Sequence, residues 1–264
     1  IPVVLAFGAY WVSSIFKGLR YSIAPTRNGV RITFGLLTTI TEIIPPGRIH
    51  AIEIRQSILW RPAGWWSIKI NRISGKSSSE GTQDQFTTVL PVGTRADVER
   101  VLELLMPGAP AETNALLFEH GVLGPREGDP YVNTPRRARI FKLFSWKRNG
   151  FAMTDEALLL RRGAVWRSLA IFPFARMQSI GLEQGPIARM LRVAAVRVHT
   201  VLGPVVGHLS PVDRDVALGL LAEAERRAVS AASSDHSHRW GEASEAPAAP
   251  VVPAPPVAQE GTVG

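Results

Sequence analysis

Alternation of apolar and polar residues is the clearest pattern in this chain. In residues 66–71 Trp, Ile and Ile alternate with Ser, Lys and Asn, and residues 194–199 place Ala and Val at every second position. A period of two puts one face of a strand on a core and the other in water, as in an antiparallel sheet. Short runs between turn signals such as Asn28-Gly29 predict more strands. These are 20–24, 30–36, 39–45 and 49–56, then 150–154, 157–163, 166–172 and 177–184.

Much of this pattern occurs twice. Residues 35–72 align on residues 163–200 without a gap, and the substitutions between them mostly keep their apolar or basic character. The identical pairs are Gly35/Gly163, Ile43/Ile171, Pro45/Pro173, Arg48/Arg176, Ile52/Ile180, Gln56/Gln184 and Arg61/Arg189. An internal repeat of this kind indicates two copies of one small domain.

Each copy is expected to end in an amphipathic helix. Thr94 and Asp97 form an N-cap pair ahead of apolar residues at helical spacing. Ser210 and Asp213 have the same spacing, with Pro211 at the first helical position. Such residues satisfy the free N–H groups of a first helical turn. The predicted fold class is therefore mainly β with capping helices.

Several motifs of the second copy resemble a known family. They are the R-R-G turn at 161–163, the pair Pro173 and Arg176, the run Q-S-I-x-L-x-Q-G-P-I at 178–187 and the strand V-R-V-H-T at 196–200. Together they resemble the bacterial pleckstrin-homology-like (PH-like) domain of the YdbS/YdbT group. The first copy is similar more loosely, and it departs near Arg27–Asn28 and by a long polar loop at Ser74–Gln85.

The resemblance implies two tandem PH-like antiparallel barrels, each sealed by its final helix, in a membrane-associated protein without assigned catalysis. Residues 1–16 carry no charge and precede Lys17 and Arg20. This favours the end of a transmembrane helix with a cytoplasmic exit. The expected organisation is a truncated transmembrane helix at 1–17, PH-like copies at 18–108 and 148–229, a linker at 109–147, and a disordered Pro/Ala-rich tail at 230–264.

The amino-acid composition excludes several kinds of chemical site. The absence of cysteine excludes disulfides, thiolate catalysis and Cys-type zinc sites. A net charge of +8 suits anionic lipid, acidic partners or nucleic acid. No nucleic-acid-binding motif supports the last of these, so no nucleic acid is expected. Neither a nucleophile elbow nor an HExxH pattern occurs, and we expect no catalytic residues, no metal site and no cofactor.

The linker contains the strongest candidate for a membrane contact. Basic and aromatic residues are interleaved there, and both can bind an anionic bilayer surface. The candidate lipid-surface contacts are Arg136, Arg137, Arg139, Lys142, Phe144, Trp146, Lys147 and Arg148. The alternative is that Phe141 and Phe144 pack on a barrel while the charges face water.

The polar residues shared by both copies form a second candidate site. They could line a repeated ligand groove, although residues shared by two copies of a fold more often fix turns and strand ends. The set is Arg48, Gln56, Arg61, Arg176, Gln184 and Arg189.

The predicted function is a membrane-anchored, non-catalytic binding or scaffolding module, with its soluble domains on the cytoplasmic side of the cell membrane. Its partner would be an unidentified membrane or cytoplasmic protein. One alternative is an anionic-lipid headgroup sensor that uses the linker with Arg27, Arg161 and Arg162. Another is an enzyme with an unrecognised site.

Overall fold

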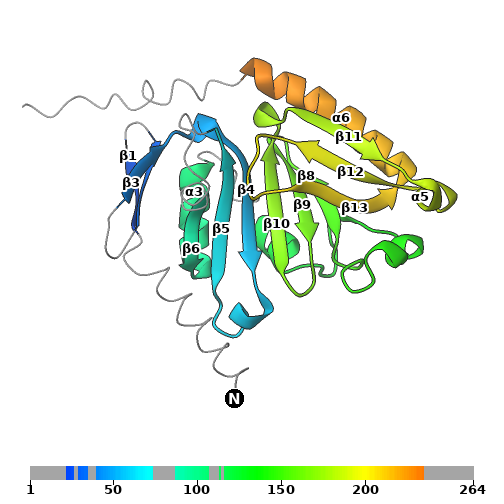
Figure 1. The fold of residues 1–264 in the computed structure, drawn as a ribbon, viewed down its shortest axis with the longest axis horizontal. Coiled ribbons are helices and arrows are strands. Elements are labelled where there is room, and N and C mark those ends of the chain that lie inside the picture. The colour runs from blue at the N-terminus through cyan, green and yellow to red at the C-terminus, as the bar shows by residue number, and fades with distance from the viewer. Residues whose placement is uncertain are drawn as a thin grey trace, which may run out of the picture.

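A computed structural model describes residues 22–26, 29–34, 40–73, 87–106, 113 and 116–234 of the protein. Its strands form three antiparallel sheets (Figure 1). The first contains β1 (Ser22–Thr26), β2 (Gly29–Phe34) and β3 (Ile40–Ile44). The third contains β11 (Ser179–Glu183), β12 (Val193–His199) and β13 (Gly207–Asp213).

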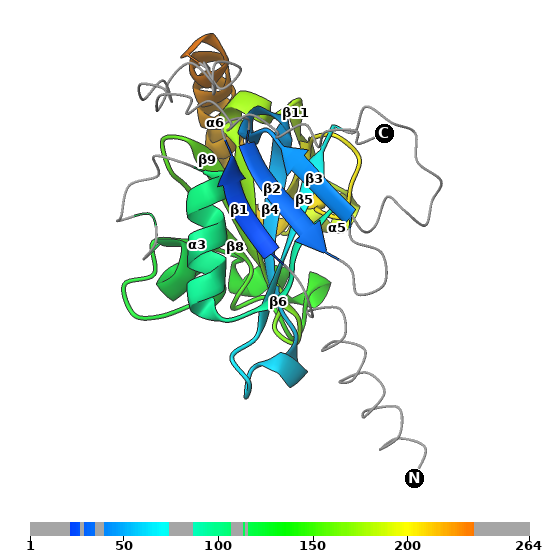
Figure 2. The ribbon, with the colours of Figure 1, turned by 90° about the vertical axis from the view of Figure 1, so that its left-hand side faces the viewer.

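The middle sheet has seven strands in the order β6-β5-β4-β10-β9-β8-β7. From the first copy come β4 (Ile49–Gln56), β5 (Trp66–Arg72) and β6 (Thr88–Gly93). The others are β7 (Val132–Asn133), β8 (Gly150–Met153), β9 (Ala157–Arg162) and β10 (Arg167–Pro173). Seen from the first-copy side, the β1–β3 sheet lies in front of β4 and β5 (Figure 2).

Three α-helices are described, α3 (Arg95–Leu105), α5 (Pro186–Met190) and α6 (Arg214–Ser234). Short helical turns join the strands, and they are η1 (Pro46–Arg48), η2 (Ile58–Trp60), η3 (Leu116–Val122), η4 (Arg136–Phe141) and η5 (Phe174–Arg176). The long helix α6 runs along the β11–β13 sheet (Figure 1).

The described strands correct the expectation of two separate antiparallel barrels. β4 of the first copy pairs antiparallel with β10 of the second, with Ile54 opposite Leu169 and Ile52 opposite Ile171. Without this pairing β4 would be the edge of the three-stranded unit β6-β5-β4, and β10 the edge of the four-stranded unit β10-β9-β8-β7. Each edge would carry a row of free N–H and C=O groups. Pairing the two edges satisfies those groups and makes one continuous sheet from the two copies.

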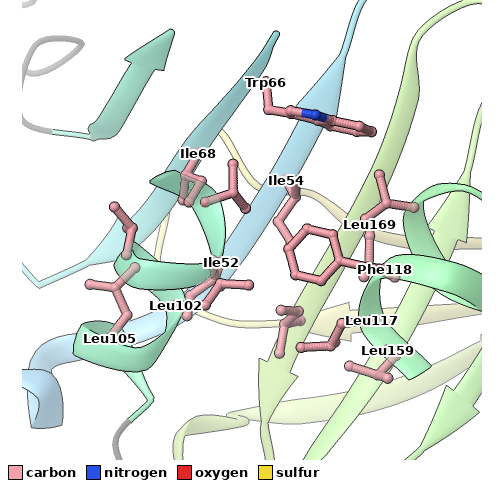
Figure 3. Packing of buried hydrophobic residues seen from close by; sticks show 14 of the residues in the cluster. Ile52, Ile54, Trp66, Ile68, Leu102, Leu105, Leu117, Phe118, Leu159 and Leu169 are labelled. Carbon is pink, nitrogen blue, oxygen red and sulfur yellow. The ribbon is translucent and has the colours of Figure 1, made fainter. Parts of the chain in front are cut away.

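One face of the continuous sheet forms the first core. Side chains from β4, β5 and β10, including Ile52, Ile68 and Leu169, pack against α3 and η3 (Figure 3). From η3, Phe118 points into the sheet and is 0% exposed. The expected sheet-facing stripe of α3 is present, because the apolar residues at helical spacing, Val98, Val101, Leu102 and Leu105, are all buried.

The opposite face forms the second core, inside the second copy. Apolar side chains of β8–β10 pack there against the β11–β13 sheet and against α6. Ala51 of β4 also belongs to this core, so the first copy contributes to the interior of the second. The two cores thus share the sheet that separates them.

The capping prediction is confirmed for one helix and wrong for the other. Thr94 and Asp97 form a capping box at the start of α3. The second helix begins at Arg214, after Pro211 and Asp213, because β13 continues to Asp213. Within that strand Val212 pairs with Ala194 and is fully buried, and this burial outweighs the local helix-start signal.

Several predicted features lie outside the described residues. They are the apolar segment 1–17, the loop Ser74–Gln85, Arg27 and most of the predicted tail. At 230–234, where a disordered tail was expected to begin, α6 continues. Within the described ranges, no helix is long and apolar enough to cross a membrane.

A glycine holds the β9–β10 hairpin that builds the junction. Gly163 has a φ of +73°, and an added Cβ would clash with the carbonyl oxygen of Trp166. We expect Gly163→Ala to lower the free energy of unfolding by about 1–3 kcal/mol, measured by urea denaturation.

Gly219 is a matched control with the opposite sign, since it lies exposed in α6 with open space around it. Gly219→Ala should stabilise the protein by up to about 1 kcal/mol. Equal effects at both positions would contradict this account.

Candidate functional site

The glutamines shared by the two copies hold equivalent turns. Nε2 of Gln56 donates to the carbonyl of Trp65 at 3.3 Å, and Nε2 of Gln184 donates to the carbonyl of Val193 at 3.0 Å. Both turns also contain a left-handed residue at the equivalent position, Gly64 with φ 62° and Arg192 with φ 49°. The repeat therefore preserves a backbone turn, and the glutamine side chain fastens it to the next strand.

The four shared arginines have diverged. The guanidinium of Arg61 donates to the carbonyls of Ala164 and Val165, in the β9–β10 hairpin of the other copy. The carbonyl of Arg176 lies 3.2 Å from Nδ1 of His50, again across the two copies. Arg48 and Arg189 are exposed. Arg61 and Arg176 thus join the copies, whereas Arg189 lies on the surface at the end of α5.

The basic–aromatic segment of the linker is strongly exposed. Phe144 is 91% exposed, Leu143 64%, Ile140 54% and Phe141 37%. The segment is anchored by Ala138, which is fully buried beside Ala188 and Val193. Apolar side chains held outward by a buried anchor form a surface that a partner or a bilayer could cover.

Helix α5 extends this surface from another part of the chain. The guanidinium of Arg137 donates to the carbonyl of Leu191 at 2.8 Å and pairs with Asp213, which fixes the segment beside α5. On α5, Met190 is 85% exposed and Ile187 is 57% exposed. Local sequence patterns do not indicate these two residues, because their proximity to the linker arises only on folding.

We define the basic–apolar surface as the exposed apolar and basic residues of the linker segment and of α5, without Arg137, which is paired with Asp213. It has apolar and cationic members in similar number. It comprises Arg136, Arg139, Ile140, Phe141, Lys142, Leu143, Phe144, Lys147, Ile187, Arg189 and Met190. This composition can bind an anionic, partly apolar layer.

Two of the predicted lipid-surface contacts, Trp146 and Arg148, do not belong to the basic–apolar surface. Trp146 is half-buried, with the ammonium of Lys147 5.7 Å from the centre of its ring. Arg148 is 6% exposed, and its guanidinium donates to carbonyls in the η3 region, including that of Val122 at 2.6 Å. Burial, followed by the charges of nearby arginines, lowers the pKa of Arg148 to about 9. Arg148 therefore supports the fold beneath the linker and does not reach its surface.

Of the three arginines that the headgroup-sensor alternative adds to the linker, Arg161 and Arg162 are internal, and Arg27 lies outside the described residues. Arg161 is 0% exposed and forms a bidentate pair with Asp129 at 3.0 and 2.5 Å. Its guanidinium also lies 4.4 Å from the centre of the Tyr131 ring. Arg162 pairs with Glu53, an acid of the first copy that is 1% exposed, at 2.8 Å. Both charges are thus occupied within the protein and are not presented to a ligand.

Asp129 is the counterion that keeps Arg161 buried. Burial alone would raise the pKa of Asp129, but hydrogen bonds from Arg161 and Asn133 and the Arg161 charge hold this pKa below its ordinary value. Within the described part of the chain, no group of three or more His, Cys, Asp or Glu could hold a metal ion.

Comparison with known protein families identifies the family of this chain. The chain matches the Bacterial PH domain family over residues 1–108 and 132–231. This protein belongs to the bacterial PH domain family. The matched stretches of this bacterial PH domain protein contain β1 to α3 and β7 to most of α6, so the basic–apolar surface lies entirely in the second. No curated protein matches the chain.

Removing the Asp129 carboxylate tests the buried pair. We expect Asp129→Asn to lower the free energy of unfolding at pH 7 by about 3–5 kcal/mol, because Arg161 keeps its charge without a counterion. Since the pKa of Asp129 is lowered from 3.8, the stabilisation is present above that pH. It is lost as the pH falls below 3.8 through the lower pKa of the folded state, so the difference between variant and parent should shrink in acid.

Thermal unfolding across pH measures this effect. Glu183→Gln is the control, because the Glu183–Arg197 pair is exposed, with 51% and 47% of the two side chains accessible. Its loss should cost about 0–1 kcal/mol. A pH-independent deficit in Asp129→Asn would show that its charge is not what matters.

Proposed function

We propose that this bacterial PH domain protein is a non-catalytic binding module of the cytoplasmic membrane face, and that its basic–apolar surface contacts the anionic lipid layer. The observation that carries the proposal is the exposure of Phe144, 91%, together with Leu143 and Met190, among cations. Covering apolar side chains that are this exposed removes their surface from water, which lowers the free energy of the complex that forms.

The chemistry of the surface suits a bilayer interface. Each Lys or Arg near an anionic membrane contributes roughly 1 kcal/mol of attraction at physiological salt. Burial of a large apolar side chain such as Phe144 contributes up to about 1.5–3 kcal/mol more. A few such residues suffice for a reversible contact, and a chain tethered nearby would bind at high effective concentration.

The rigid attachment of the surface supports the same proposal. Ala138 and Ala188 are buried together, and Arg137 bridges the linker to the carbonyl of Leu191. Little order is lost on binding when the contacting residues are already held in place. The PH-like sheets then act as the platform that presents the surface.

A scaffolding role for a partner protein is the second candidate. The loop between β12 and β13 crosses to the first copy, where the side-chain amide of Asn71 bonds both N–H and C=O of Val205. At the outside of this loop Leu202 is 94% exposed and Val206 is 58% exposed. A partner bound there would contact the junction of the two copies.

A single fluorescent reporter can test the membrane contact, because the chain has no cysteine. We expect a polarity-sensitive dye on Leu143→Cys in the full chain to shift to the blue on phosphatidylglycerol vesicles and to become protected from iodide. Added salt should reverse both effects, since the attraction is partly electrostatic. Arg139→Gln with Lys142→Gln should weaken the contact by about 30-fold, which corresponds to two charges.

The control places the same dye on Val229→Cys in α6, where the native side chain is 69% exposed and lies away from the surface. Its spectrum should not change. A Leu143 reporter that stays in water on anionic vesicles, or responds equally to phosphatidylcholine, would refute the lipid contact. The scaffolding role would then remain.

A further inference from the structure

A cluster of arginines without enough acids marks a second site, separate from the basic–apolar surface. We propose that a phosphate-bearing anion binds where η2 meets the β9–β10 hairpin, between Arg61 of the first copy and Arg167 of the second. The site exists only because the two copies share one sheet.

The strand register brings these residues together. Arg167 opens β10 and lies opposite Gln56, the last residue of β4. Arg61 follows η2 and reaches across to the carbonyls of Ala164 and Val165, which lie in the turn leading to Arg167. Arg61, just after η2, and Arg167, the first residue of β10, are therefore carried at the same end of the β4–β10 ladder.

The charges of this cluster are not balanced. Arg167 is half-buried, and within the described residues its side chain has no hydrogen-bond or ion-pair partner. Burial and then the charge of Arg167 lower the pKa of Arg61, and the charge of Arg167 also lowers that of Arg148. The neighbouring acid, Asp129, is already engaged by Arg161. Like charges held together in a partly buried place are costly unless an anion joins them.

Unused hydrogen-bond donors strengthen the inference. Nε of Arg61 and Nε1 of Trp60, on the same turn, are both buried and have no partner. Nε of Arg148 behind them is also buried without a partner, on a residue only 6% exposed. Buried donors in native proteins are normally satisfied, so a set of them beside free positive charge points to a missing acceptor.

The expected ligand is a tetrahedral oxyanion. Guanidinium groups bind phosphate through paired N–H donors, and an indole N–H can add another. The rim of the site is apolar, with Trp166 71%, Ile58 45% and Val165 42% exposed. The phosphate could thus belong to a lipid headgroup or to a free anion, because both share this chemistry.

Thermal unfolding of the full chain distinguishes these sources. In chloride buffer of constant ionic strength, inorganic phosphate should raise the melting temperature of the parent protein. In Arg167→Gln the half-saturating phosphate concentration should rise about tenfold or more. Arg167→Lys should retain part of the response, and Arg100→Gln, an exposed arginine of α3, should retain all of it.

A second measurement separates binding from folding. In chloride alone, Arg167→Gln should melt at the same temperature as the parent or higher, because repulsion from Arg61 and Arg148 is relieved. Loss of stability in chloride would make Arg167 a structural residue and overturn the proposal.

Soluble short-chain phosphatidylglycerol, compared with phosphatidylcholine, forms the lipid arm. A response to phosphatidylglycerol that requires Arg167 while inorganic phosphate gives none assigns the site to a lipid headgroup. A response to both includes the free anion. If neither response depends on Arg167, no such site exists.

Discussion

The antiparallel pairing of β4 with β10 is the interaction on which the rest of this structure depends. It replaces two exposed sheet edges by one hydrogen-bonded ladder, and it places Ile52 and Ile54 beside Ile171 and Leu169. A strand edge left open would invite pairing with other chains. Closing both edges within one chain joins strands from the two copies of this bacterial PH domain protein in one continuous sheet.

This junction also accounts for a buried acid of the first copy. Glu53 of β4 is 1% exposed and lies between Arg162 and Arg55, so an acid of the first copy neutralises an arginine of the second. Asn71 of β5 holds the β12–β13 loop in the same way. Deleting one member of a buried polar contact lowers the stability of the protein by more than the contact itself contributes. Such contacts therefore fix the relative position of the two copies.

The proposed functions follow from what the junction leaves outside. The middle sheet and helices α3 and α6 pack against the two cores. The residues proposed for binding lie on η4 with its following segment, on the short helix α5, on η2 and on the β9–β10 hairpin. Binding residues carried on loops above a rigid scaffold are common in proteins. In this chain the loops combine cations with apolar side chains, and lipid and phosphate are ligands that suit this combination.

The sequence alone determined the repeat, most strands, the α3 capping box and the family, because these depend on local periodicity and on spacing. Folding decided the rest. Whether Arg161 and Arg148 face water or carbonyls depends on partners far away in the chain, as does the meeting of α5 with the linker. Local patterns could not predict the shared sheet either, because an edge strand has the same alternation of apolar and polar residues whichever strand it pairs with.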